Sequence, residues 1–196
     1  IVVPDLELNR GDELLVLGKS GSGKTTLLNI LGGLQAPNKG EVWIGGVSLY
    51  ELKGNDLDKF RGSNIGIVFQ KPHLLGPLTV SENICLPHFF ANKPTANKLD
   101  YYLKELGIQD KKDARIQTLS EGEAQRVSIA RAMVNEPKVI LADEPTASLD
   151  DDNARMVVNL LKNQAKKLQA TLIIVTHDYR IKDQIDRSIS IKSGSL

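Results

Sequence analysis

Gly18-Lys19-Ser20-Gly21-Ser22-Gly23-Lys24-Thr25 is the stretch that decides the fold of this chain. It follows an apolar run, Leu14–Leu17, that is typical of a buried strand, and it leads into Thr26–Leu31, whose apolar spacing predicts a helix. The pattern G-x-x-x-x-G-K-[ST] between a strand and a helix is typical of a loop that binds nucleotide phosphates. Its glycines let several backbone N–H groups face one anion, and the positive end of the helix dipole points to the same place.

Two side chains of this loop have expected roles in chemistry. Lys24 is predicted to reach the β- and γ-phosphates, and the hydroxyl of Thr25 is predicted to bind Mg²⁺. A plain Gly/Ser-rich turn is the alternative, and the flanking strand and helix argue against it. The other residues of this region that we expect to contact the nucleotide are Gly18, Lys19, Ser20, Gly21, Ser22, Gly23 and Thr26.

The composition is that of a globular protein with one substantial core. Of the 196 residues, 41% are hydrophobic and 25% are charged, and the net charge of +1 gives no electrostatic case for a nucleic-acid partner. A single cysteine, Cys85, excludes an internal disulfide and indicates a reducing compartment. No apolar run approaches the roughly 20 residues that cross a bilayer. The chain begins with Ile1, close to the first predicted strand, so we expect a truncated amino terminus.

The order of predicted elements indicates an α/β fold with a mainly parallel sheet. Residues 5–17 are predicted as an antiparallel edge hairpin with its turn at Asn9–Asp12. Between residues 71 and 135 the strand-like runs disappear and prolines become frequent. We therefore expect a P-loop NTPase core from residues 1–70 and 136–196, carrying a helical insertion of residues 71–135. Further strands are expected at 41–44, 65–69, 138–142, 171–175 and 188–191, and helices at 56–61, 95–106, 121–135 and 151–168.

Polar side chains follow three of the predicted strands. Asp143 and Glu144 follow one of them, and in a protein with a phosphate loop the first commonly holds Mg²⁺ while the second can polarise the attacking water. His177 and Gln70 follow two others, at the edge of the sheet where ligands of open α/β folds bind. Each has an ordinary alternative, because acidic strand ends, loop glutamines and lone histidines are common.

Ser120 and Glu123 begin a predicted helix and permit two interpretations. Serine followed three residues later by glutamate is a capping box, which needs no ligand. The same helix start, with Gly122 in its first turn, also offers N–H groups and a positive dipole end to an anion. The sequence leaves both interpretations open.

Taken together, these motifs resemble the nucleotide-binding subunit of ABC transporters over nearly the whole chain. Residues 18–25 resemble the phosphate loop of that family, Leu119–Glu123 its signature, and Ala147–Asp150 its D-loop. In the resemblance, Gln70 is the Q-loop glutamine, which touches metal and water, and His177 is the switch histidine. Ser120, Gly122, Glu123 and Asp150 would contact nucleotide across an interface.

The resemblance implies an ATPase that uses ATP and Mg²⁺. Two identical or paired ATPase subunits would sandwich two ATP molecules, so that a monomer hydrolyses poorly, and they would drive integral membrane permease subunits. The location would be peripheral, at the cytoplasmic face of the inner membrane, with no nucleic acid involved. Residues 60–83 are most similar to the branch that contains lipoprotein-releasing, macrolide-exporting, peptide-resistance and cell-division ATPases.

Two departures from the family pattern stand out. Glu121 occupies a signature position that is usually glycine, and the aromatic residue that stacks on adenine lies upstream of Ile1. Six apolar residues are expected either to receive a coupling helix of a membrane subunit or to belong to the core: Leu74, Leu75, Leu78, Val80, Phe89 and Phe90. A soluble ABC-type ATPase acting on DNA or ribosomes is the alternative function.

Overall fold

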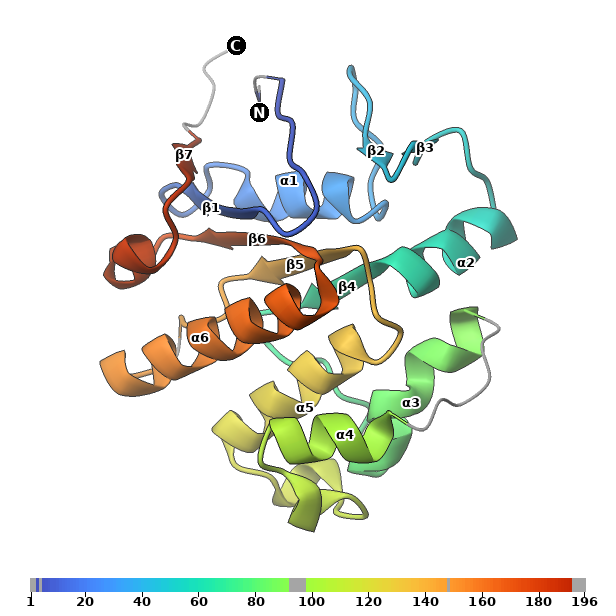
Figure 1. Cartoon of the computed structure of the whole chain (residues 1–196), viewed down its shortest axis with the longest axis vertical. Helices are drawn as coiled ribbons and strands as arrows, with labels where there is room; N and C mark the ends of the chain where they lie inside the picture. Colours follow the sequence, from blue (N-terminus) through green and yellow to red (C-terminus); the bar gives the residue numbers. More distant parts are fainter. Residues whose placement is uncertain (1–2, 4, 92–97, 148, 192–196) are drawn as a thin grey trace.

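The computed structural model describes residues 3, 5–91, 98–147 and 149–191. Five strands form one parallel sheet in the spatial order β4-β5-β6-β1-β7 (Figure 1). The result confirms the predicted α/β class and its mainly parallel sheet. The bounds are β1 (Glu13–Leu17), β4 (Ile65–Val68), β5 (Val139–Asp143), β6 (Thr171–Thr176) and β7 (Ser188–Ser190).

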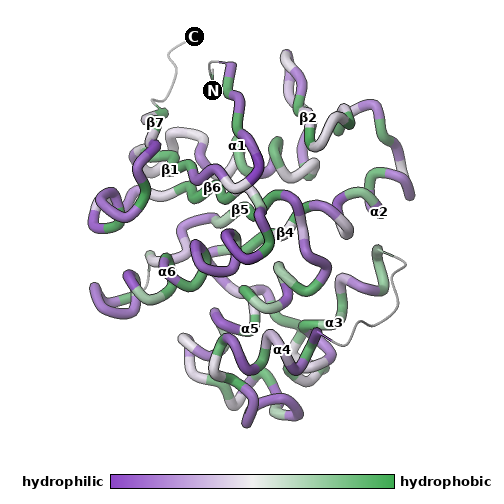
Figure 2. Tube along the Cα trace, in the orientation of Figure 1, coloured by the Kyte–Doolittle hydropathy of each residue, from purple (hydrophilic) through white to green (hydrophobic). Residues whose placement is uncertain are grey.

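Both faces of the sheet are covered, because side chains alternate along each strand. On one face, Leu15 and Ile140 pack into a core with helices α5 (Glu121–Met133) and α6 (Asp151–Leu168). On the other face, Leu14 and Leu141 pack with helix α1 (Lys24–Leu31). Figure 2 shows the hydrophobic residues concentrated along the strands and the polar ones along the outer turns.

The predicted antiparallel hairpin at residues 5–17 is wrong in its first arm. The turn exists, since the amide of Asp12 donates to the Asn9 carbonyl at 3.1 Å, but residues 5–9 form no strand. The reason is that β1 is already hydrogen-bonded to β6 on one side and to β7 on the other, which leaves no free edge. The antiparallel pair that does form is a separate two-stranded sheet, β2 (Trp43–Ile44) with β3 (Val47–Ser48).

The region between β4 and β5 contains the helices α3 (Val80–Ala91), α4 (Leu99–Glu105) and α5, and one of them was not expected. These helices gather at the end of the molecule opposite β2 and β3 (Figure 1). The sequence did not predict α3, because proline normally disrupts the interior of a helix and α3 contains Pro87. Residues 95–97, where the predicted helix 95–106 begins, lie outside the described residues. Helix α2 (Asn55–Asn64) precedes β4 and extends the predicted helix at 56–61.

The carboxyl end of α5 lies directly on β4. A β-carbon added to Gly66 would come within 2.2 Å of the carbonyl oxygen of Ala132, so glycine is required for this contact. Arg131, one residue earlier, donates to the carbonyls of Pro72 and His73 at 2.6 and 2.9 Å. The last turn of α5 is therefore fixed both to the sheet and to the loop that follows Gln70.

Within the described ranges, none of the helices combines the length and the apolar character required to cross a bilayer.

Candidate active site

The parallel register brings the predicted polar residues to one edge of the sheet. Leu17 pairs with Thr176, and Asp143 pairs with Val175, so the phosphate loop, Glu144 and His177 all follow directly from neighbouring strand ends. Val68 pairs with Ala142, which places Gln70 beyond the same edge, where it is exposed. Because ligands of open α/β sheets bind at the carboxyl ends of the strands, this edge of the sheet is the candidate site.

The phosphate loop has the backbone that its glycines permit. Gly21 and Gly23 have φ angles of +78° and +94°, a region that other residues rarely adopt. A β-carbon on Gly18 would meet the Ser22 hydroxyl at 2.4 Å and the Ile191 carbonyl at 2.9 Å. Helix α1 begins after Gly23 with no side-chain cap, so its first N–H groups are available to an anion.

Lys24 points from the start of α1 back across the loop. Its Nζ donates to the carbonyls of Gly18 at 2.9 Å and Lys19 at 3.1 Å, and it lies 3.3 Å from the Oε1 atom of Glu144. The side chain is only 6% exposed. A buried ammonium group is therefore held between the phosphate loop and the carboxylate that follows β5.

Glu144 is the most heavily constrained residue of the site. Its backbone has a left-handed φ of 46°, which costs roughly 1–3 kcal/mol for a residue other than glycine. Thr176 donates to Oε2 at 2.7 Å, the amide of His177 donates to the carboxylate at 3.1 Å, and the His177 ring Nδ1 lies 2.8 Å from Oε1. Burial raises the pKa of the Glu144 carboxyl, but the hydrogen bonds from His177 and Thr176 outweigh it, and the net pKa is lowered. The carboxylate is therefore ionised and oriented at neutral pH.

His177 itself differs from Glu144 in exposure. Its side chain is 56% exposed, although its ring meets the buried carboxylate. The imidazole thus has one nitrogen toward Glu144 and a face open to an incoming ligand, which suits a group that touches a substrate phosphate.

Asp143 is suited to hold a divalent cation. Its Oδ1 atom is buried and has no hydrogen-bond partner among the described residues. Burial raises the pKa of its carboxyl, and a hydrogen bond with the Thr25 side chain opposes that rise. Thr25 and Asp143 therefore approach each other and present the hard oxygen donors that Mg²⁺ prefers. No cluster of three His, Cys, Asp or Glu side chains able to hold a metal occurs in the described part of the chain, so hydroxyl, amide and phosphate oxygens would have to complete the shell.

The helix start at Ser120 is capped as the sequence allowed. The amide of Glu123 donates to Ser120 Oγ at 3.3 Å, and Glu123 Oε2 accepts from the Ser120 amide at 2.8 Å. This confirms the capping box. The second interpretation stays open, because Gly122 has no atom within 4 Å of the place where a β-carbon would lie.

A cavity of about 610 Å³ adjoins this helix start. Its walls include Ser120, Gly122 and Glu123 on one side and Leu149 and Asp150 on the other. No residue of the phosphate loop lines it, so Ser120 and Asp150 face a different space from Lys24 and Glu144. Ser148, between Ala147 and Leu149 in the predicted D-loop, lies outside the described residues.

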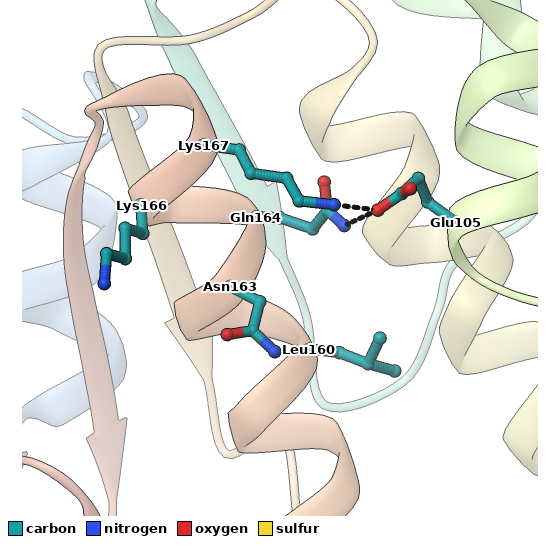
Figure 3. A pocket seen from close by; sticks show the side chains of 6 residues that line it. All are labelled: Glu105, Leu160, Asn163, Gln164, Lys166 and Lys167. Atoms are coloured by element: carbon teal, nitrogen blue, oxygen red, sulfur yellow. Dashed lines mark hydrogen bonds and ion pairs between the residues drawn. The ribbon is translucent and has the colours of Figure 1, made fainter.

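A second cavity, of about 350 Å³, lies between the end of α4 and α6. Figure 3 shows Lys167 and Gln164 pointing toward Glu105, while Lys166 points away from it. It contains no residue of the motifs described above, and its Gln164 and Lys167 side chains are bound to Glu105. We therefore place the functional site at the strand ends.

Three residues that support the site were missed by the sequence reasoning. Thr176 donates to Glu144, Thr146 donates to Asp178 at 3.0 Å, and Arg180 binds Asp178 with two nitrogens at 2.8 and 2.9 Å. Apart from the Arg180–Asp178 pair, these contacts join loops about thirty residues apart in the sequence, so no local pattern reveals them.

Comparison with known proteins identifies the family. A family model described as ABC transporter matches residues 3–147. The chain belongs to the ABC transporter family. This ABC cassette is thus an ATP-binding subunit that hydrolyses ATP.

Several relatives of the ABC cassette are similar over nearly its full length. The lipoprotein-releasing system ATP-binding protein LolD of Legionella pneumophila (strain Lens) is 39% identical over 195 residues, which cover 98% of this chain and 86% of that protein. LolD 2 of Chlorobaculum tepidum is 40% identical over 200 residues, covering 98% and 81%. A solved ATP-binding cassette, a dimer in a post-hydrolysis state with ADP and Pi, has a TM-score of 0.86 at 36% identity and covers 96% of this chain and 84% of its own.

Proposed function

We propose that the ABC cassette works as one of two paired subunits that close around two ATP molecules, and that each ATP is held by the phosphate loop of one subunit and the Ser120 helix start of the other. The observation that carries this proposal is the separation of the two half-sites. Ser120 and Asp150 line a cavity that contains no residue of the phosphate loop. One subunit then supplies its phosphate loop to one ATP and its Ser120 helix start to the other ATP.

Within one half-site, each side chain has a distinct role. Lys24 and the open N–H groups of α1 bind the phosphates, and the Glu144 carboxylate orients the attacking water. His177 holds Glu144 in place and faces the γ-phosphate. Thr25, Asp143 and Gln70 would hold Mg²⁺, which when bound neutralises charge on the β- and γ-phosphates.

The membrane partner is the second part of the proposal. The LolD relatives are named as parts of a lipoprotein-releasing system, and we propose a substrate of that kind, with the cassette peripheral to the cytoplasmic face of the inner membrane. Residues 71–135 would form the helical subdomain that contacts the membrane subunits. Leu75, Phe89 and Phe90 are exposed there, whereas Val80 is fully buried in the core.

Mixing two inactive variants tests the pairing directly. Lys24→Ala disables the phosphate-loop half, and Ser120→Arg disables the helix-start half. If each site draws on both subunits, a mixed dimer regains one intact site, and random mixing of a symmetric pair should restore about a quarter of the wild-type ATPase rate.

The control is each variant alone at the same total concentration, which should remain inactive. A mixture that is no more active than the separate variants would show that both halves act on one nucleotide within one chain, and the pairing would be rejected.

A further inference from the structure

Arg180 joins two loops that border the active site. It lies three residues after His177, in the 3₁₀ segment η3 (Tyr179–Gln184). Its Nε and Nη2 atoms donate to the two oxygens of Asp178 at 2.9 and 2.8 Å. The same guanidinium donates to the Leu149 carbonyl at 3.3 Å and to Asp151 Oδ1. One planar group therefore holds a residue after β6 and the segment that begins α6.

The Asp178 end of this contact continues to Glu144. The amide of Asp178 donates to Thr176 Oγ1 at 2.9 Å, and that hydroxyl donates to Glu144 Oε2 at 2.7 Å. Asp178 also accepts from Thr146 at 3.0 Å. Asp178, Thr176 and Thr146 are all buried, and hydrogen bonds shielded from water in this way hold their geometry more strongly than surface ones.

The other end of the contact reaches the cavity beside Ser120. Leu149 and Asp150 line that cavity, and Asp150 caps α6 by accepting from the amide of Asn153 at 2.9 Å. Arg180 is thus the side chain that connects the wall of this cavity to the support of the Glu144 carboxylate.

The bonding pattern is stronger than that of an ordinary surface ion pair. An exposed pair of single charges contributes about 0–1 kcal/mol, but Arg180 meets a buried carboxylate with two parallel N–H donors. The hydrogen bonds from Arg180 are the main reason why the pKa of Asp178 is lowered. Lysine carries the same charge but lacks the fork that reaches Asp178, Leu149 and Asp151 together.

We propose that Arg180 is a positioning residue that makes residues 149–151 move together with Glu144 and His177. The proposal rests on the paired half-sites proposed above. In each subunit, Glu144 would then reach its catalytic position only when residues 149–151 are also in position. Those residues border the surface that meets the ATP bound by the partner subunit. Hydrolysis at the two sites would be coupled through this contact.

The test uses Arg180→Gln in the full chain and separates binding from coupling. Affinity for a fluorescent ATP analogue at low protein concentration should stay within about twofold of wild type, because no contact of Arg180 touches the phosphate loop. The maximal ATPase rate should fall at least about fivefold, and the Hill coefficient for ATP should fall toward one. Arg180→Lys should fall between wild type and Arg180→Gln in both quantities.

Matched carboxamide variants keep the test decisive if Arg180→Gln does not fold. Asp151→Asn removes the negative charge at the outer end of the contact, at a side chain that is 74% exposed. Asp152→Asn removes the same charge from the same turn of α6 without touching a contact of Arg180. The first should lower the Hill coefficient and the second should not.

Two results would overturn the proposal in distinguishable ways. A folded Arg180→Gln with the wild-type rate and Hill coefficient, or equal behaviour of the two carboxamide variants, rejects the role of Arg180 alone. A wild-type protein that hydrolyses ATP with a Hill coefficient of one at every protein concentration rejects the paired half-sites, and the role of Arg180 with them.

Discussion

Glu144 and Asp143 are adjacent carboxylates whose pKa values are shifted in opposite directions. Glu144 receives hydrogen bonds from Thr176 and His177, and its pKa is lowered in spite of burial. Asp143 is buried with an oxygen that lacks a partner within the described ranges, and its pKa is raised. The surroundings of Glu144 suit an ionised group that orients water. The surroundings of Asp143 suit a carboxylate that binds a cation.

Replacing Asp143 should therefore stabilise the folded protein while it damages the reaction. A carboxyl whose pKa is raised on folding stabilises the protein below the pKa of the unfolded chain, and this contribution is lost as the pH rises through the folded-state pKa. Asp143→Asn should raise the free energy of unfolding near neutral pH by on the order of 1 kcal/mol, because no charge is left buried. Urea unfolding at several pH values measures this gain.

The gain should shrink as the pH falls, since the wild-type carboxyl becomes neutral. The same variant should lose Mg²⁺-dependent hydrolysis of ATP. A variant that is less stable than wild type at neutral pH would contradict this account of Asp143, and Asp152→Asn on the surface serves as the control for simple charge removal.

Residue motifs with a fixed local spacing were predictable from the sequence. The phosphate loop, Asp143, Glu144 and His177 were all expected at strand ends, and the structure places them at one edge of the sheet. Thr176 and Arg180 were not expected, because their importance comes from partners that are distant in the sequence.

At the scale of elements, helix α5 begins with Glu121, at the position where the resemblance to the ABC signature implies glycine. Glu121 occupies the first turn, where an acidic side chain suits the helix dipole but also places negative charge near a surface proposed to meet a polyanion. In a Glu144→Gln background that blocks hydrolysis, Glu121→Gly should tighten the ATP-bound dimer about fivefold, the effect of roughly 1 kcal/mol from one charge near a surface. Gel filtration at a series of concentrations measures the change.

Glu121→Gln removes the negative charge but keeps a side chain of similar size. It therefore distinguishes the loss of charge from the loss of the side chain. If charge is the cause, it should tighten the dimer to the same degree. A dimer that is unchanged or weaker for both variants would refute the repulsion.

Two elements show where local patterns failed. Thr79 and Glu82 form a capping box at the start of α3, with the Thr79 amide donating to Glu82 at 2.7 Å, and this pattern was readable in the sequence. The prolines obscured it. The absent first strand of the hairpin at residues 5–17 was not readable, because the partners that occupy both edges of β1 come from the other end of the chain.

At the scale of the whole molecule, two of the exposed aromatic side chains lie on α3, in the helical region between β4 and β5. Phe89 and Phe90 are 81% and 57% exposed at the end of α3. Replacing both with serine should reduce co-purification with the proposed membrane subunits at least about tenfold, because aromatic anchors dominate interfaces. The stability and the ATPase rate of the free subunit should change little.

Trp43→Ser is the matched control. Trp43 is an exposed aromatic residue on β2, at the opposite end of the molecule (Figure 1). Equal loss of the membrane subunits from both variants would mean that general surface hydrophobicity, and not the α3 end, governs the association.

The contact between Gly66 and Ala132 fixes the carboxyl end of α5 against the sheet. Glycine at position 66 lets that turn of the helix lie against the β4 backbone, so we expect any tilt of α5 to turn about this contact. Ser120 stands at the far tip of a 13-residue helix, roughly 20 Å from the pivot, and a tilt of about 15° would carry it some 5 Å. A small angular change, imposed from the membrane side, would thus be enough to bring this serine to a nucleotide or take it away.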